Sequence, residues 1–177
     1  MRNKKSLLRI TYTAIFTAIV ILATSVIKFS TGLGEGYIHL GDCFIYLSAC
    51  VLPFPYCLIP GALGGALADI LSGYVVWSIP TMIIKMLNAL PFALMCKKYK
   101  SNKILTKQIV LMAVVSGLIT ILGYFIAECI LYSVASATLS LLGNTIQAVS
   151  SGIIFVIIAK ATDKINLKSK IFRVIAN

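Results

Sequence analysis

The amino-acid sequence predicts an all-α integral membrane protein, and three observations support this fold class. Of the 177 residues, 59% are hydrophobic and 12% are charged, whereas soluble domains contain about 45–50% apolar and about 25% charged residues. The mean hydropathy is +0.98. The basic residues are concentrated between long apolar stretches. A chain of this length has room for about six or seven spanning helices. It contains no GxxxxGK[ST] phosphate loop, and we therefore expect no ATP hydrolysis by this chain.

Most of the basic residues fall in three clusters, which predict the orientation of the chain. The clusters are Arg2, Lys4, Lys5 and Arg9; Lys97, Lys98, Lys100, Lys103 and Lys107; and Lys160, Lys164, Lys168, Lys170 and Arg173. Lysine and arginine accumulate in short cytoplasmic segments, so we expect both termini and the middle cluster to face the cytoplasm. The net charge of +11 does not indicate nucleic-acid binding, because the basic residues flank the predicted membrane spans.

Apolar stretches and their interruptions predict a single transmembrane domain, 1–177, with six helices. Their expected ranges are about 8–27, 40–52, 56–73, 79–96, 108–127 and 139–160. Pro53-Phe54-Pro55 separates the second helix from the third, because proline lacks an amide donor and restricts the residue before it. The polar run 133–140 predicts the turn before the last helix. With this count, an even number of crossings separates each basic cluster from the next.

The longest outer connection, 28–39, contains Gly32, Gly34 and Gly36. A glycine-rich loop of this length is typical either of a lid over a binding site or of a mobile surface loop. The sequence leaves both alternatives open.

Polar side chains gather at the outer ends of the predicted helices. Ionisable groups inside a bilayer are usually paired or face a cavity. Lys85 and Asn88 lie three residues apart, hence on one helical face, and Asn144 and Gln147 repeat this spacing. Aromatic walls with a few polar groups are typical of a small-molecule pocket. The candidate substrate-binding residues are Tyr37, His39, Asp69, Tyr74, Trp77, Lys85, Asn88, Glu128, Asn144 and Gln147.

Structural roles are the alternative for several of these candidates. Tyrosine and tryptophan also belong to the interfacial belt of membrane proteins. For Lys85 and Asp69 the alternative is a structural pair in which the two charges neutralise each other. A histidine at a loop end, such as His39, is more often a solvated or capping residue than a ligand. The chain has 1 histidine and 5 cysteines, and no CxxC motif, so we expect neither a metal site nor a cofactor. No serine or cysteine is visibly placed with a histidine and an acid for nucleophilic catalysis.

Two stretches of small residues predict close helix contacts. Gly61 and Gly65 form a GxxxG step, and Ala14 and Ala18 form an AxxxA step in the first helix. Such faces let helix backbones approach closely, within a chain or toward a partner. We expect internal packing at Gly61 and docking of a partner at Ala14 and Ala18.

The ordered motifs of the middle third resemble a known transporter family. They are LGD at 40–42, GALGGALAD at 61–69, SGYVVW at 72–77 and TMIIK at 81–85. In this order they resemble the substrate-binding S components of energy-coupling factor (ECF) vitamin transporters. The resemblance is greatest to the branch with hydroxymethylpyrimidine, pyridoxine and riboflavin-type members. Pro53-Phe54-Pro55, where a glycine-proline turn is common in the family, and Glu128 depart from this pattern.

The resemblance implies a six-helix S component in the bacterial plasma membrane that captures a vitamin or vitamin precursor beneath the first loop. It also implies partners, namely a membrane coupling subunit that contacts Ala14 and Ala18, and two cytoplasmic ATPases. The expected ligand is hydroxymethylpyrimidine or a pyridoxine-like compound, then riboflavin. The alternative is a small secondary transporter or channel subunit, which would be favoured by internal repeats that the sequence does not show. A membrane-embedded enzyme is a further alternative without visible catalytic groups.

Overall fold

The structure, a computed structural model, describes residues 2–26, 28–30, 37–98 and 101–176. Helices form nearly all of these ranges. The elements are α1 (Arg2–Ser25), β1 (Lys28–Ser30), β2 (Tyr37–His39), α2 (Gly41–Val51), η1 (Tyr56–Leu58), α3 (Ile59–Leu71), η2 (Val75–Trp77), α4 (Ser78–Lys98), α5 (Lys107–Leu131), α6 (Val134–Lys164) and α7 (Leu167–Ala176). The short 3-10 helices η1 and η2 lead into α3 and α4.

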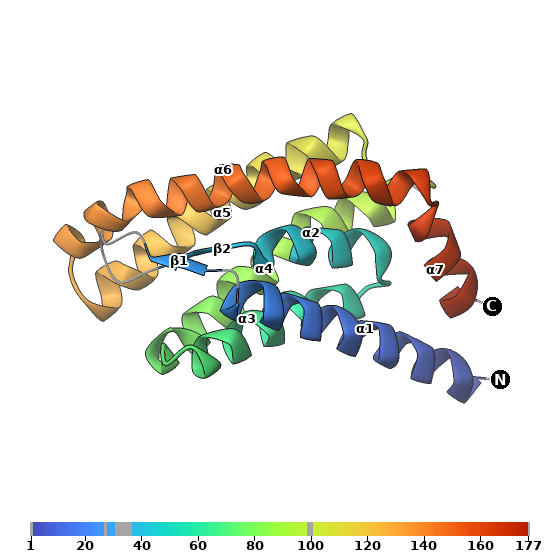
Figure 1. Cartoon of the computed structure of the whole chain (residues 1–177), viewed down its shortest axis with the longest axis horizontal. Coiled ribbons are helices and arrows are strands. Elements are labelled where there is room, and N and C mark those ends of the chain that lie inside the picture. Colours follow the sequence, from blue (N-terminus) through green and yellow to red (C-terminus); the bar gives the residue numbers. More distant parts are fainter. Residues whose placement is uncertain (1, 27, 31–36, 99–100, 177) are drawn as a thin grey trace.

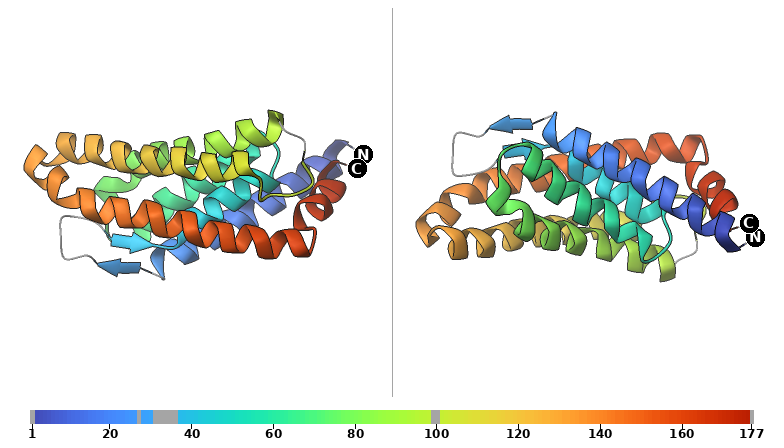
Figure 2. Two further views of the ribbon diagram at one scale, coloured as in Figure 1. Left: turned by 90° about the horizontal axis from the view of Figure 1, so that it is seen from above. Right: turned by 90° about the horizontal axis from the view of Figure 1, so that it is seen from below.

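The helices form an elongated bundle in which α5 and α6 lie side by side along its length (Figure 1). Both termini lie at the same end of this bundle, as all three views show (Figures 1 and 2). The end of α4 and the start of α5 point toward that end as well. The three basic clusters of the sequence are therefore directed to one end of the molecule.

Four helices are long and apolar enough to cross a membrane, within the ranges Lys4–Ser25, Val75–Lys98, Lys107–Leu131 and Val134–Lys164. Two shorter apolar helices, Gly41–Val51 and Tyr56–Leu71, accompany them. The outward faces are apolar, since Leu118, Leu122 and Ile153 are all more than half exposed. Such a surface suits lipid as its solvent. The chain is thus a helical, multi-pass membrane protein, while the number of six crossings stays a prediction.

The short helix α2 occupies the middle of the bundle, between α6 and α1 (Figure 1). All its residues except Phe44 are buried. Its Tyr46 ring stacks on Phe92 of α4 with a centroid distance of 4.7 Å and meets Phe155 of α6 edge-on at 5.7 Å. These three rings fix α2 against α4 and α6, because aromatic pairs of this geometry add to the free energy of burial.

The helices α3 and α4 approach closely where the sequence has its GxxxG step. A Cβ atom built on Gly61 would lie 2.6 Å from the carbonyl oxygen of Lys85, and one on Gly65 would lie 2.9 Å from Thr81. Glycine at both positions removes these clashes. This approach places the residues of α4 that surround Lys85 next to α3.

The structure differs from the sequence predictions in three places. β1 and β2 form a small antiparallel hairpin, with Lys28 opposite His39, so the fold is not purely helical. The polar run 133–140 is not a turn, because Ser133 caps α6 by accepting a hydrogen bond from the Ser136 amide. The last basic cluster extends into an additional helix, α7. The glycines at 32, 34 and 36, which the lid prediction uses, lie outside the described residues.

Candidate substrate-binding site

A buried ion pair between α4 and α2 forms the centre of the polar cluster. Lys85 Nζ lies 2.6 Å from Asp42 Oδ1, and their side chains are 1% and 0% exposed. Charges removed from water in this way are tolerated only when they are paired. The alternative expectation that Lys85 pairs with Asp69 is therefore corrected, although Asp69 is also buried. Asp42 comes closer because the whole of α2 lies inside the bundle.

Gln147 connects this ion pair to the hairpin and to α6. Its Nε2 lies 3.0 Å from Asp42 Oδ2 and 2.9 Å from the His39 carbonyl oxygen, and it donates to these acceptors. Its Oε1 accepts a hydrogen bond of 2.7 Å from the His39 amide. One buried side chain thereby joins α6, the end of β2 and the first turn of α2.

His39 holds the start of α2. The Gly41 amide donates to His39 Nδ1 over 3.0 Å, so the ring satisfies an N–H at the helix start that has no partner within the helix. The pKa of His39 is lowered to about 4, mainly by burial. The nearby Asp42 carboxylate opposes this shift, whereas the positive charge of Lys85 adds to it. His39 is therefore neutral at neutral pH, and the structure supports its capping role.

Asn88 lies one turn beyond Lys85 and is fully buried. Its side-chain Nδ2 donates to Thr120 Oγ1 of α5 over 2.8 Å, and its backbone carbonyl oxygen accepts from Ser116 Oγ over 2.7 Å. Its Oδ1 has no hydrogen-bond partner among the described residues. A buried carbonyl oxygen normally has a partner, so Asn88 retains an acceptor for a further donor.

Aromatic side chains border the lysine. Trp77 is 8% exposed, and its ring lies 5.8 Å from that of Tyr124 and 5.9 Å from that of Tyr132. Lys85 Nζ lies 5.1 Å from the Tyr124 ring centroid, within the range of a cation–π interaction. Thr81 and the Tyr124 hydroxyl share a hydrogen bond of 3.2 Å. The aromatic wall and the ion pair therefore form one continuous group.

Glu128 has its own partners at the junction of α5 and α6. It is 2% exposed, and its Oε1 accepts hydrogen bonds from Ser140 at 2.6 Å and Ser136 at 3.2 Å. Asn144 lies one turn after Ser140 and is half-buried. Both residues belong to the same end of the bundle as Trp77, but the described contacts do not link them to Lys85.

Two candidates, Tyr74 and Tyr37, remain to be placed, together with residues that were not among the candidates. Tyr74 is half-buried, and its amide donates to the Asp69 carbonyl over 2.8 Å. Tyr37 lies in β2, but its side chain is outside the description. The list of candidates omitted Asp42 and Tyr124, although the sequence placed both at the outer level, and Thr120 was not considered. The LGD motif already signalled Asp42, whereas the hydroxyl of Thr120, in an apolar stretch, gave no signal of its own.

Among the residues that the structure describes, no group of three or more histidine, cysteine or acidic side chains could hold a metal ion. The chemistry of the cluster is that of recognition, with a lysine, a carboxylate, amides and aromatic rings held rigidly between helices. This composition matches the few placed polar groups and aromatic walls of small-molecule sites. The fold and the cluster together define a membrane protein with a buried polar cluster that is a candidate recognition site.

Comparison with known protein families shows to which family of membrane proteins the chain belongs. The model of the family "ECF-type riboflavin transporter, S component" matches residues 4–164. The chain therefore belongs to this family. It is a substrate-binding subunit of an ECF transporter, it acts in vitamin uptake, and it is not an enzyme. A search of curated proteins found no match.

Proposed function

We propose that this chain captures riboflavin from outside the cell and delivers it to an ATP-driven importer in the bacterial plasma membrane. The observation that carries the proposal is the buried cluster of Lys85, Asp42, Gln147 and Asn88, where Asn88 Oδ1 has no partner among the described residues. The ligand is proposed as riboflavin because the family that matches the chain is described by that vitamin.

Riboflavin fits the chemistry of these residues. Its flat ring offers carbonyl and imide groups to amide side chains, and its ribityl chain offers hydroxyl groups. An imide N–H or a hydroxyl group would satisfy Asn88 Oδ1, and the ring would lie against the aromatic wall of Trp77 and Tyr124. The first prediction, hydroxymethylpyrimidine or a pyridoxine-like compound, has no support from the family comparison and remains a prediction that a ligand panel tests.

The ligand can be tested by fluorescence, because Trp77 is the single tryptophan of the chain. The purified protein in detergent is titrated with riboflavin, hydroxymethylpyrimidine, the pyridoxine vitamers and thiamine. Free tryptophan serves as the control for light absorption by the flavin. We expect saturable quenching by riboflavin alone. Saturation by one of the other compounds would overturn the ligand assignment, and silence with the whole panel would overturn the assignment of Trp77 to the site.

We also propose that α1 docks on the membrane coupling subunit, which two cytoplasmic ATPases drive. Ala14 and Ala18 are both exposed, four residues apart on one face of α1. Small residues in a membrane helix allow a partner helix to approach closely. Both termini and the middle basic cluster are proposed to face the cytoplasm, because lysine and arginine concentrate there.

Docking and capture are separable by mutation. Ala14→Trp is expected to abolish vitamin uptake by the complete importer in vesicles while leaving ligand binding unchanged. Leu118→Trp, at an exposed position in the middle of α5, is the matched control and should retain uptake. Normal uptake by the Ala14→Trp variant would contradict the proposed docking face. Ion-coupled flux through this chain without its partners would instead favour the secondary-transporter alternative.

A further inference from the structure

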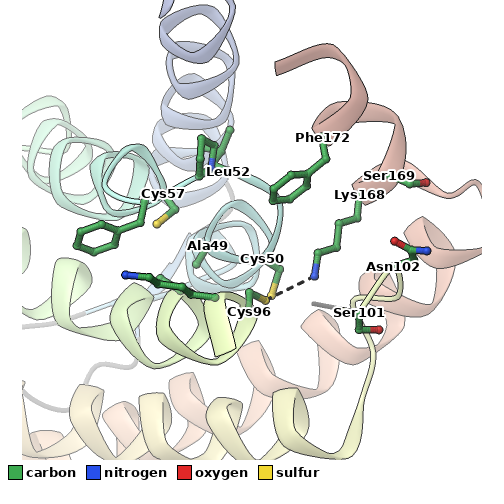
Figure 3. A pocket seen from close by; sticks show the side chains of 14 residues that line it. Ala49, Cys50, Leu52, Cys57, Cys96, Ser101, Asn102, Lys168, Ser169 and Phe172 are labelled. Carbon is green, nitrogen blue, oxygen red and sulfur yellow. Dashed lines mark hydrogen bonds between the residues drawn. The ribbon is translucent and has the colours of Figure 1, made fainter. Parts of the chain in front are cut away.

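A second candidate site lies near the other end of α4. A cavity of about 630 Å³ is bounded by the ends of α2 and α4, the connection 52–57 and α7 (Figure 3). Lys85 and Cys96 are both in α4, and the helical rise separates them by about 16 Å. The cavity is therefore distinct from the proposed ligand site and belongs to the end that carries the basic clusters.

Two thiols from different helices meet at this cavity. Cys50 comes from α2 and is 1% exposed, whereas Cys96 comes from α4 and is half-buried. The sulfur atoms of Cys50 and Cys96 lie side by side in Figure 3. Both residues line the cavity, so a small polar molecule in the cavity would contact Cys96.

A buried lysine of α7 points at the same sulfur. Lys168 is 7% exposed, and its Nζ lies 3.7 Å from Cys96 Sγ. Within the part of the chain that the structure describes, Lys168 has no ion pair with a carboxylate, unlike Lys85 with Asp42. A buried ammonium group is costly unless an opposite charge accompanies it. The Cys96 sulfur, at 3.7 Å, would supply that charge as a thiolate, and a neighbouring lysine favours this form.

We propose that Cys96 is a reactive thiolate that hydroperoxides oxidise, and that Cys50 then closes a reversible Cys50–Cys96 disulfide. Three features support this assignment: the cavity gives access, Lys168 lies where it would stabilise the thiolate, and Cys50 lines the cavity beside Cys96. Cys43, by comparison, is fully buried and its thiol donates to the Leu40 carbonyl oxygen. The disulfide would connect the ends of α2 and α4.

The chemistry balances with hydrogen peroxide as the oxidant. The Cys96 thiolate attacks one peroxide oxygen, so an S–O bond forms while the O–O bond breaks, and the departing hydroxide takes a proton to become water. The sulfur of Cys50 then loses its proton and attacks the Cys96 sulfenic acid. The S–S bond forms as the S–O bond breaks, which releases a second water. Two thiols are oxidised by two electrons, and one peroxide is reduced to two waters.

The reactivity of Cys96 is tested by timed alkylation of the reduced, full-length protein in detergent with N-ethylmaleimide at neutral pH. Peptide mass spectrometry then reports the rate at each of the five cysteines. We expect Cys96 to react fastest, and Lys168→Met to slow it about tenfold, as the loss of a neighbouring charge predicts. Lys168→Arg should restore the rate. Lys170→Met, at an exposed position of α7, is the matched control and should leave the rate unchanged.

The second step is tested by treating the same preparations with hydrogen peroxide. A cross-linked peptide pair containing Cys50 and Cys96 is expected from the unmodified protein. Cys50→Ser should instead yield a dimedone adduct on Cys96, since the sulfenic acid has no thiol to react with. The proposal is overturned if Cys96 is alkylated equally fast in Lys168→Met, or if peroxide produces neither the cross-link nor the adduct. Ligand binding at the Lys85 cluster should persist after oxidation, so this test is independent of the proposed function.

Discussion

Two lysines are buried in this molecule near opposite ends of α4, and their surroundings differ. Lys85 forms an ion pair of 2.6 Å with a carboxylate, and Gln147 holds the same carboxylate from α6. Lys168 instead donates to the Cys96 thiol, with 3.7 Å between Nζ and Sγ. A paired lysine contributes to a fixed site, because removing either charge leaves the other unpaired. A lysine beside a thiol changes the reactivity of that thiol instead.

This difference predicts that the same substitution destabilises the protein strongly at Lys85 and only slightly at Lys168. Lys85→Met should lower the free energy of unfolding by about 3–5 kcal/mol, because Asp42 is left buried and charged. Lys168→Met should change it by less than about 1 kcal/mol, because no carboxylate is left behind. The thermal unfolding of both variants in detergent, followed by circular dichroism, measures the contrast. Equal shifts in Tm would remove the distinction between the two lysines, and Asp42→Asn should recover part of the loss in Lys85→Met.

Lowering the pH should reduce the free energy of unfolding, because His39 is buried in its neutral form at the end of the bundle that contains Lys85. The pKa of His39 is lowered to about 4 by burial, so the unfolded chain takes up this proton first as the pH falls. Stability is therefore lost as the pH decreases from about 6.5 to about 4, by roughly 3 kcal/mol at most. His39 is the single histidine of the chain. Unfolding midpoints across this range should show the loss, and His39→Asn should flatten it; an unchanged pH profile in that variant would contradict the assignment.

Close packing of α3 on α4 stabilises the same end of the bundle. Alanine substitutions at two glycines, one at this contact and one away from it, test this packing. Gly61→Ala should destabilise the protein by about 1–3 kcal/mol, because the added Cβ meets the Lys85 carbonyl oxygen at 2.6 Å. Gly152→Ala in α6 meets no atom within 4 Å and should raise stability by about 0.5–1 kcal/mol. Thermal unfolding again provides the measurement. Tolerance of alanine at Gly61 would mean that the two helices are less close than described.

Much of the helical plan is readable from the sequence because membrane helices need long apolar stretches and proline interrupts them. Tertiary packing decides what the sequence leaves open. Asp42 and Asp69 lie at the same level, and burial of α2 selects Asp42 as the partner of Lys85. The run 133–140 is polar like a turn, but Ser136 and Ser140 donate to Glu128 from within α6. Lys168 belongs to the last basic cluster of the sequence, whose residues are expected to be solvated, whereas in the structure α7 buries its side chain.

The sequence predicted the membrane depth and the residue types of the candidate site. It did not predict which side chains contact one another there. Lys85, Asn88 and Gln147 were predicted because polar residues are rare in apolar helices. The structure buries all three, and their role in binding stays a prediction. The capping role of His39 was an open alternative, and the hydrogen bond from the Gly41 amide supports it. Thr120 was missed because threonine is frequent in membrane helices without any role in binding.

The central claim is that the cluster around Lys85 and Asn88 binds the vitamin, and equilibrium dialysis with riboflavin tests it most directly. The purified chain should bind riboflavin saturably at one site. Asn88→Ala should weaken this binding by about tenfold, the effect of losing one buried hydrogen bond, while Asn102→Ala, exposed near the other end of the bundle, should bind normally. Absence of saturable binding, or equal affinity in the Asn88→Ala variant, would contradict the account.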